Sequence, residues 1–491
     1  MRSLLVAAIG LSVCASACVR QQRFRFVPAR TACFPETASA PRVAAPADQK
    51  PSLDCRQSQY SLGFIEFDST GKVFDPNQEA AVLTLLDREK ARAAGGKIIT
   101  VVYVHGWKNN AAEAAPGGKP QDVERFQSAL SELGYRAGMA AQAANAKPVP
   151  IVGVYMAWRG KTLMGPSWFT FVSLWGRRNT ANRIGSGPDL APILNRIIEK
   201  TNDRNGSSRV LMIGHSFGAR VLEHAIETQQ VKLYDAVPDG GLVNPRVDLV
   251  LYVNSANDSR LSMGRVQNFR AHPFQARHPD FNPAECAAAP GALSTDDTAS
   301  RTGRCGDYPL LVAITSKGDL ATKYLLPIAN TINGDSNSAP APPLPLKDEF
   351  ADPLPPAGRY KRVAAGHFPF LQSHVTREVA CPVIPPSAVR AQREKALHPV
   401  CAPDDKDCRF VFRTLGEQPT CFQVDARPDV DGRPPFNRTP FWIMSVEPAV
   451  ITDHGDIWNL SFVEMLGQLM APRGFFEGGA RRIQLRANMG S

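Results

Sequence analysis

The chain has 491 residues, 43% hydrophobic and 21% charged, so it has the composition of a globular protein with a large core and is not disordered throughout. Its apolar stretches are shorter than the roughly 20 residues of a membrane-spanning helix, which excludes a polytopic membrane protein. The 56 Lys and Arg against 46 Asp and Glu give a net charge of +10, but these basic residues are scattered, so we expect a basic surface and no nucleic-acid partner.

The N-terminus has the pattern of an export signal. A positive start (Met1-Arg2-Ser3) is followed by an apolar run and then by small residues, which predicts a signal peptide over residues 1–17. Cys18 comes directly after Ala-Ser-Ala and resembles the modified cysteine of bacterial lipoproteins. The resemblance implies a membrane anchor through lipid at Cys18, and Val19 favours the outer membrane, facing the periplasm or the cell surface. The alternative is a soluble periplasmic or secreted protein.

The cysteines beyond the signal region are even in number. An even set in an exported chain predicts up to four disulfides, with the connectivity left open. No C-x-x-C spacing occurs, so we expect no metal site. The eight positions are Cys33, Cys55, Cys286, Cys305, Cys381, Cys401, Cys408 and Cys421.

Strand-like and helix-like segments alternate along the chain after a Pro- and Ala-rich tether over residues 18–50. Several strands are continuously apolar, as in IITVVYV, which is typical of strands buried on both faces of a parallel sheet. The expected strands are 62–67, 98–104, 151–157, 210–213, 247–253, 310–315 and 441–446. The expected helices are 76–92, 126–144, 191–200, 219–228 and 457–470.

This alternation predicts an α/β fold with a mainly parallel central sheet flanked by helices. We expect one domain over residues 51–475, followed by a C-terminal tail over 476–491. Stretches near 270–307, 335–358 and 381–440 break the alternation and are interpreted as loop insertions, the first and last of them containing cysteines.

A Gly-x-Ser-x-Gly motif, Gly214-His215-Ser216-Phe217-Gly218, lies between an expected strand and an expected helix. This is the context of a nucleophile elbow, in which a sharp turn exposes the serine Oγ above the sheet. The helix that follows presents its free N–H groups to a developing oxyanion. Ser216 is therefore the candidate nucleophile, and the alternative is a glycine-rich structural turn.

The strand over 98–104 ends in His105-Gly106-Trp107, which supplies a candidate second oxyanion donor. We expect the backbone N–H of Phe217 and that of Gly106 or Trp107 to form the oxyanion hole. His105 is expected to hold this loop. His215 is expected to be structural, because a base adjacent to the serine on a tight turn cannot easily face its Oγ.

A nucleophilic serine needs a base and an orienting carboxylate, in the chain order Ser, acid, His. Asp319 follows the strand over 310–315 and is the favoured acid, with Asp258 as the alternative. His454 follows the last strand and is the favoured base, with His367, inside an insertion, as the alternative.

With these residues in place, the chain resembles the α/β-hydrolases, and among them bacterial serine esterase-like proteins. The resemblance rests on VYVHGWKNNA, VGVYMAWRG, IGHSFGAR, VNSAND, TSKGDLATKYLLP, AAGHFPFLQSH and ITDHGDIWNLSF, which span residues 102–462. It implies an α/β-hydrolase fold, triad roles for Ser216, Asp319 and His454, and hydrolysis of carboxylic esters without a cofactor. The cysteine-bearing insertions depart from it.

The segment 163–176 is rich in aromatic residues (Trp168, Phe169, Phe171 and Trp175). It is interpreted as a hydrophobic lid, an acyl pocket or a membrane-contacting surface, with a helix packed in the core as the alternative. A small-molecule or lipid ester is the expected substrate. Two other functions stay open: an acyltransferase that uses the same triad, and a non-catalytic binding lipoprotein of the envelope.

Overall fold

The computed structural model describes residues 23–27, 50–55, 59–114, 117–143, 145–160, 167–202, 208–228, 231–236, 242–271, 275–276, 309–332, 362–379, 410–414, 420–426, 440–470 and 475. The expected signal peptide, Cys18, the insertion 335–358 and the C-terminal tail lie outside the described residues.

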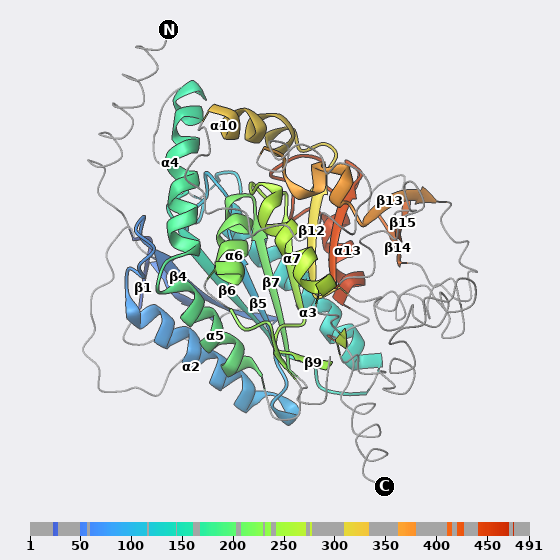
Figure 1. Ribbon diagram of the computed structural model, residues 1–491. Coiled ribbons are helices and arrows are strands. Elements are labelled where there is room, and N and C mark those ends of the chain that lie inside the picture. Colours follow the sequence, from blue (N-terminus) through green and yellow to red (C-terminus); the bar gives the residue numbers. More distant parts are fainter. Residues whose placement is uncertain are drawn as a thin grey trace.

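An 11-stranded sheet forms the centre of the molecule (Figure 1), with the strand order β14-β15-β13-β16-β12-β10-β7-β5-β6-β4-β3. The eight strands from β13 to β4 in this order are parallel, and β3, β15 and β14 are added antiparallel at the two edges. Their bounds are β3 Leu53–Asp54, β4 Tyr60–Phe67, β5 Ile99–Val104, β6 Ile151–Trp158, β7 Arg209–His215, β10 Leu249–Val253, β12 Leu311–Ser316, β13 His374–Val379, β14 Phe410–Arg413, β15 Cys421–Ala426 and β16 Phe441–Val446.

Helices cover both faces of this sheet (Figure 1). One core cluster takes side chains from α2, α4, α5, α6 and α7, and the other takes them from α3 and α13. The bounds are α2 Pro76–Arg92, α3 Asp122–Ala143, α4 Ser167–Gly185, α5 Leu190–Thr201, α6 Phe217–Thr228, α7 Ser259–Ala271, α10 Leu326–Ile332 and α13 Leu460–Met470. Short helical turns are η1 Ala94–Gly96, η2 Ala321–Leu325, η3 Ala365–His367 and η4 Pro369–Leu371.

The continuous apolarity of the central strands follows from this two-sided cover. In β5, Val102 and Val104 enter one core cluster, whereas Val101 and Tyr103 enter the other. Because neighbouring side chains of a strand point to opposite faces, both sets must be apolar. The predicted α/β class with a mostly parallel sheet is thereby confirmed. None of the described helices is long and apolar enough to cross a membrane.

Part of the expected tether packs on this body. Arg25 and Phe26 form β1, which pairs with β2 (Lys50–Pro51). The backbone N–H groups of Phe24 and Arg25 donate to the Glu66 carboxylate, and the buried Arg25 guanidinium lies 3.0 Å from Glu113. These charges fix residues 23–27 to the fold, so this part of 18–50 is no free linker.

The stretch 381–440 is also more regular than its sequence indicates. It contributes β14 and β15, and β15 pairs antiparallel with β13 from Val379↔Cys421 to His374↔Ala426. The sheet therefore extends beyond β16, the last strand in the chain. Within 270–307, the structure describes only the end of α7 and β11 (Gln275–Ala276), which joins β8 (Tyr234–Ala236) and β9 (Leu242–Pro245) in a small sheet.

Two of the eight cysteines fall in the described residues. Cys55 and Cys421 are both disulfide-bonded. The other six lie outside the described residues, so the predicted four-bridge framework and its connectivity stay a prediction.

Candidate active site

Ser216 lies at the turn between β7 and α6. Its φ is 55°, which lies in the left-handed region. This backbone conformation is energetically unfavourable for any residue that has a side chain. The turn is held from both sides: the Ser216 N–H donates to the Val253 carbonyl (3.0 Å) and the Ala256 N–H donates to the Ser216 carbonyl (3.1 Å). This strained, over-determined turn matches the expected nucleophile elbow.

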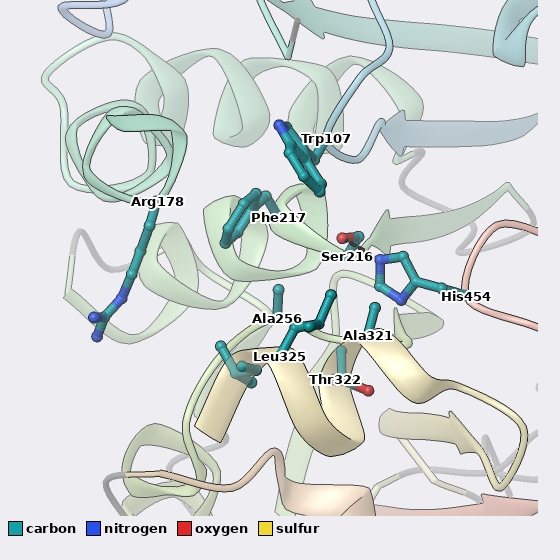
Figure 2. Close-up of a pocket in the computed structure, with 10 residues that line it drawn as sticks. Trp107, Arg178, Ser216, Phe217, Ala256, Ala321, Thr322, Leu325 and His454 are labelled. Atoms are coloured by element: carbon teal, nitrogen blue, oxygen red, sulfur yellow. Dashed lines mark hydrogen bonds between the residues drawn. The ribbon is translucent and has the colours of Figure 1, made fainter. Parts of the chain in front are cut away.

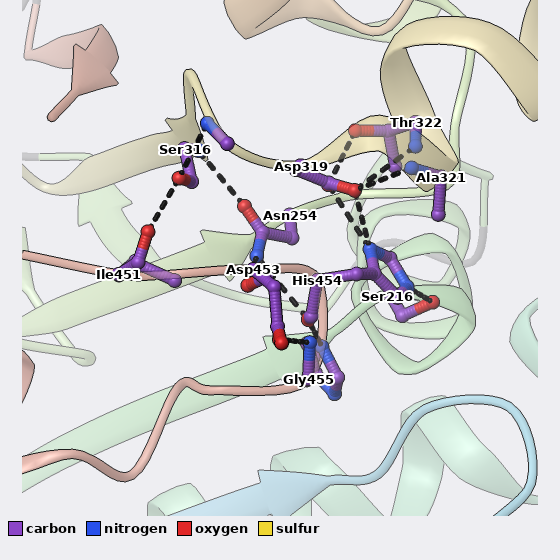
Figure 3. Close-up of polar contacts among 12 residues, drawn as sticks. Ser216, Asn254, Ser316, Asp319, Ala321, Thr322, Ile451, Asp453, His454 and Gly455 are labelled. Carbon is purple, nitrogen blue, oxygen red and sulfur yellow. Dashed lines mark hydrogen bonds and ion pairs between the residues drawn. The ribbon is translucent and has the colours of Figure 1, made fainter. Parts of the chain in front are cut away.

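Three side chains that are far apart in the chain meet at this turn (Figure 3). Ser216 Oγ lies 2.7 Å from His454 Nε2, and His454 Nδ1 lies 3.0 Å from both carboxylate oxygens of Asp319. Since a carboxylate only accepts, Nδ1 carries the proton and donates it to Asp319. Nε2 is then the acceptor that faces the serine hydroxyl.

Their meeting follows from the parallel sheet. Ser216 follows β7, Asp319 follows β12 and His454 follows β16, and these strands run in the same direction. Parallel strands end at the same edge of a sheet, and ligand sites of open α/β sheets lie outside that edge.

The Asp319 carboxylate is buried but well supplied with donors. Oδ1 accepts the N–H groups of Ala321 (3.0 Å) and Thr322 (3.1 Å), and Oδ2 accepts the Thr322 hydroxyl. Burial alone raises the pKa of Asp319, but the hydrogen bond and charge attraction of His454, with the Thr322 hydrogen bonds, outweigh it and lower that pKa. The carboxylate is therefore ionised and can accept the hydrogen bond from His454 Nδ1.

The loop that carries His454 is held by His215 and by Asn254, and sequence reasoning assigned no role to Asn254. His215 Nε2 lies 2.7 Å from the His454 carbonyl, and the Asn254 amide donates to the carbonyls of Asp453 and His454, 3.2 Å each. Asn254 Oδ1 in turn accepts the Ser316 N–H at 2.9 Å (Figure 3). His215 is buried and structural, as expected. Asn254 has φ 46°, and this unusual turn at the end of β10 is the only local sign of its role.

The loop after β5 approaches the serine closely. A Cβ on Gly106 would lie 2.9 Å from Ser216 Cβ, so only glycine lets this backbone pass. Phe217 begins α6, and the first N–H groups of a helix have no acceptor within the helix. The structure thus brings Gly106, Trp107 and Phe217 around Ser216, where an oxyanion would form.

His105 holds this loop from behind. Its Nδ1 lies 2.8 Å from the Gly106 carbonyl, and its Nε2 accepts the Trp158 N–H at 3.0 Å. The ring stacks on the Trp158 indole with an interplanar angle of 2°. Burial lowers the pKa of His105 to about 4, so the ring is neutral at pH 7 and makes both bonds.

The alternative acid lies elsewhere. Asp258 is buried and its carboxylate accepts Arg260 Nε (2.7 Å) and Nη2 (2.9 Å). This two-pronged pair occupies both oxygens of Asp258, whereas His454 Nδ1 contacts Asp319. Geometry therefore favours Asp319 as the acid.

The alternative base lies on the other side of the chosen acid. His367 Nε2 lies 3.0 Å from Thr322 Oγ1. Because the Thr322 hydroxyl donates its one proton to Asp319, His367 is the donor in this pair. His367 thus faces Thr322 and the backbone of Asp319 instead of Ser216.

A pocket opens beside the serine (Figure 2). It is partly open to solvent, with Ser216 and His454 at one end and Arg178 at the other. The Arg178 guanidinium points away from the serine. The walls are mainly apolar, since the remaining lining residues are Trp107, Phe217, Ala256, Ala321, Thr322, Leu325 and Leu326.

The aromatic side chains of the segment 163–176 cannot be assigned to the pocket. Helix α4 begins at Ser167, but the side chains of Trp168, Phe169, Phe171 and Trp175 lie outside the described residues. A lid or pocket role for them stays a prediction. Among the described residues, no group of three or more His, Cys, Asp or Glu side chains could hold a metal ion.

Buried histidines make the folded state sensitive to acid. Burial lowers the pKa of His105 to about 4 and those of His215 and His374 to about 3, below the unfolded value of about 6.5. The unfolded chain therefore binds more protons, and the stability that these residues contribute above pH 6.5 is lost as the pH falls. We expect the free energy of unfolding in urea to be lower at pH 5 than at pH 7.5, by about 2 kcal/mol for each of these histidines before opposing groups are counted.

Two buried carboxyls oppose this trend and limit its size. Burial raises the pKa of Glu223 to about 7 and of Asp122 to about 6, so their contribution grows as the pH falls. His374, which stacks on Trp442 far from Ser216 in the sequence, serves as the test. His374→Asn should make the difference between the two pH values about 2 kcal/mol smaller. The same difference in the variant and the wild type would contradict the assignment.

No known family model matches this chain, and no curated protein matches it in sequence. Two solved structures are similar to parts of it. A lipase-esterase related protein from Clostridium acetobutylicum has 11% identity and a TM-score of 0.15, over 46% of this chain and 76% of that one. An uncharacterized protein from Pseudomonas aeruginosa has 12% identity and a TM-score of 0.21, over 52% of this chain and 42% of that one. These distant overlaps leave the function to be argued from the site.

Proposed function

We propose that this protein is a serine hydrolase of the α/β-hydrolase fold that cleaves carboxylic esters through an acyl-enzyme. The observation that carries the proposal is the alignment of Ser216 Oγ, the His454 ring and the Asp319 carboxylate, with contacts of 2.7 and 3.0 Å. Such an alignment lets a weak nucleophile give up its proton as it attacks.

In the first half of the reaction, Ser216 Oγ attacks the ester carbonyl while His454 Nε2 takes its proton. Asp319 accepts from Nδ1 throughout, which fixes the tautomer and stabilises the imidazolium as it forms. The backbone N–H of Phe217 and that of Gly106 or Trp107 stabilise the charge on the carbonyl oxygen. His454 then returns the proton to the leaving alcohol.

In the second half, water attacks the acyl-enzyme with His454 again as the base, and the acid is released. The apolar pocket suits the acyl chain of the ester. An acyltransferase would use the same groups and replace the water by an alcohol. Product analysis with added alcohols separates the two, since a transferase forms the new ester in preference to the free acid.

A fluorophosphonate probe tests the proposal directly, because it phosphonylates only an activated serine. The purified protein should be labelled on the peptide that contains Ser216, and a series of p-nitrophenyl esters should be hydrolysed at rates that depend on acyl length. Labelling at a different serine, or none at all together with no ester hydrolysis, would overturn the proposal and favour a non-catalytic binding protein.

Thr322 offers a test of how Asp319 is held. Thr322→Val removes the hydroxyl that donates to Asp319 and that accepts from His367. Losing one hydrogen bond to a charged group is expected to lower kcat about tenfold. Initial rates with a soluble short-chain ester measure this change.

Thr322→Ser keeps the hydroxyl and should restore kcat to near the wild-type value. Thr84, exposed on α2, has a hydroxyl that bonds only within its own helix, so Thr84→Val is a matched control without effect. If Thr322→Val were as fast as Thr84→Val, the hydroxyl would have no part in positioning Asp319.

We also propose that the protein is exported and anchored in the outer membrane through lipid at Cys18. The proposal is supported by the signal-like residues 1–17 and the small residues before Cys18. Radiolabelled palmitate should enter the wild type and not Cys18→Ser. Equal label in both would leave the alternative of a soluble periplasmic or secreted protein.

A further inference from the structure

An exposed apolar face lies on the segment that follows Asp319. Six large hydrophobic side chains are exposed among the described residues. Four of them lie in the nine-residue stretch 320–328, which contains η2 and the start of α10. The apolar face consists of Leu320 (62% exposed), Tyr324 (54%), Leu325 (37%) and Ile328 (49%). A cluster of exposed apolar side chains of this kind marks an interaction site.

The helical geometry places these side chains together. Leu320, Tyr324 and Ile328 are spaced four residues apart, which puts successive members of the series on one side of a helix. The opposite side is buried: Thr322 and Leu326 are covered by the body of the protein. The segment is therefore anchored by one side and presents the other to its surroundings.

The apolar face is continuous with the pocket at Ser216. Leu325 belongs to the face and also lines the pocket, as Ala321 and Leu326 do. Figure 2 shows Leu325 and Ala321 on the same side of the pocket. In Figure 1, α10 lies at the top of the molecule. An apolar group resting on this face thus has an unbroken apolar path to the serine.

We propose that the apolar face docks on a lipid surface. The segment 320–332 contains one basic residue, Lys323, and no acidic residue. Lys323 is exposed, and its Nζ lies 5.5 Å from the centroid of the Tyr324 ring. Apolar side chains with a lysine among them match the boundary between acyl chains and anionic headgroups.

The chemistry of the occupant follows from this composition. The aliphatic side chains bury their surface among acyl chains, Tyr324 suits the interface with its ring and hydroxyl, and Lys323 reaches the phosphates. As a consequence that rests on the proposed function, the substrate is an ester presented at a lipid surface, whose acyl chain enters the pocket past Leu325.

Vesicle binding tests the proposal without relying on catalysis. The experiment uses the full chain with Cys18→Ser, so that no lipid attached at position 18 contributes, and vesicles of phosphatidylcholine and phosphatidylglycerol. Leu320→Ser/Tyr324→Ser/Ile328→Ser, none of them a pocket residue, is expected to sediment with vesicles about tenfold more weakly than the parent. Its rate with a soluble short-chain ester should be unchanged.

The matched control removes exposed apolar surface elsewhere. Tyr135→Ser/Leu460→Ser changes the two remaining exposed large hydrophobics, on α3 and α13, and should bind vesicles like the parent. Ser216→Ala should also bind like the parent, so vesicle binding that needs the apolar face supports the proposal even if no ester is hydrolysed. Equal binding by the triple variant and the parent would overturn it. A second result would also overturn it. If the parent does not bind vesicles and is a dimer by light scattering, and if the triple variant is a monomer, the apolar face joins two copies of the chain.

Discussion

Ser216→Ala is expected to lower kcat for ester hydrolysis by about 10⁵-fold. The residue is the only oxygen nucleophile that His454 Nε2 faces at hydrogen-bond distance among the described residues. Without it, the pocket and the oxyanion donors still bind an ester, but water must attack without a covalent intermediate. Steady-state kinetics with a p-nitrophenyl ester, followed over hours, measure the residual rate.

The same variant should remain folded. It loses one hydrogen bond, to His454, so its free energy of unfolding should change by about 1 kcal/mol. Ser128, exposed on α3, bonds only the Glu124 carbonyl of its own helix, and Ser128→Ala serves as the matched control with wild-type kcat. A folded Ser216→Ala that kept wild-type turnover would show that the chemistry lies elsewhere on the molecule.

The central strands could be predicted because both their faces are buried. Ile99–Val104 and Phe441–Val446 are apolar at almost every position, and the sequence places both within a residue. The strand β13, His374–Val379, escaped prediction. Its side chains are mostly polar and only part of them are buried, since it lies near the edge of the sheet, so neither a continuous nor a strictly alternating pattern marks it.

The three candidate catalytic residues could be predicted because each lies in the turn or loop that follows a strand of one parallel sheet. Chain order then places them at one edge, and only the choice between Asp319 and Asp258, and between His454 and His367, needed geometry. The Asp258 carboxylate forms a salt bridge with Arg260, two residues further along the chain. No pattern in the sequence shows whether such a carboxylate is paired with its neighbour or free.

The supporting roles of Asn254 and Thr322 could not be predicted, because the partners of these residues are distant in the chain. Asn254 bonds the carbonyl of His454, 200 residues away, and Thr322 bonds His367, 45 residues away. A polar residue in a loop has no periodicity, and its hydrogen bonds depend on the packing of several strands. Such residues can be identified only from the three-dimensional structure.

Gly218→Ala is expected to lower the free energy of unfolding by at least about 3 kcal/mol. A Cβ at this position would lie 2.0 Å from the Val104 carbonyl oxygen and 2.5 Å from that of His105. Both atoms belong to backbone at the end of β5, which pairs with β7, so neither moves aside as a flexible side chain would. Helix α6 must instead shift, and the N–H of Phe217 moves with it, so kcat should fall as well. Urea unfolding and ester kinetics on the same preparation measure the two effects.

Gly138 provides the matched comparison. It lies within α3, where a Cβ would meet none of the described atoms within 4 Å. Gly138→Ala gains helix propensity without a clash and should raise the free energy of unfolding by about 0.5–1 kcal/mol, with kcat unchanged. The two substitutions are thus expected to change the free energy of unfolding in opposite directions. Gly218 permits close approach of two backbone segments at the elbow, whereas Gly138 only adds flexibility to a helix. Equal effects of the two substitutions would show that α6 does not pack against the end of β5 as closely as the proposed oxyanion hole requires.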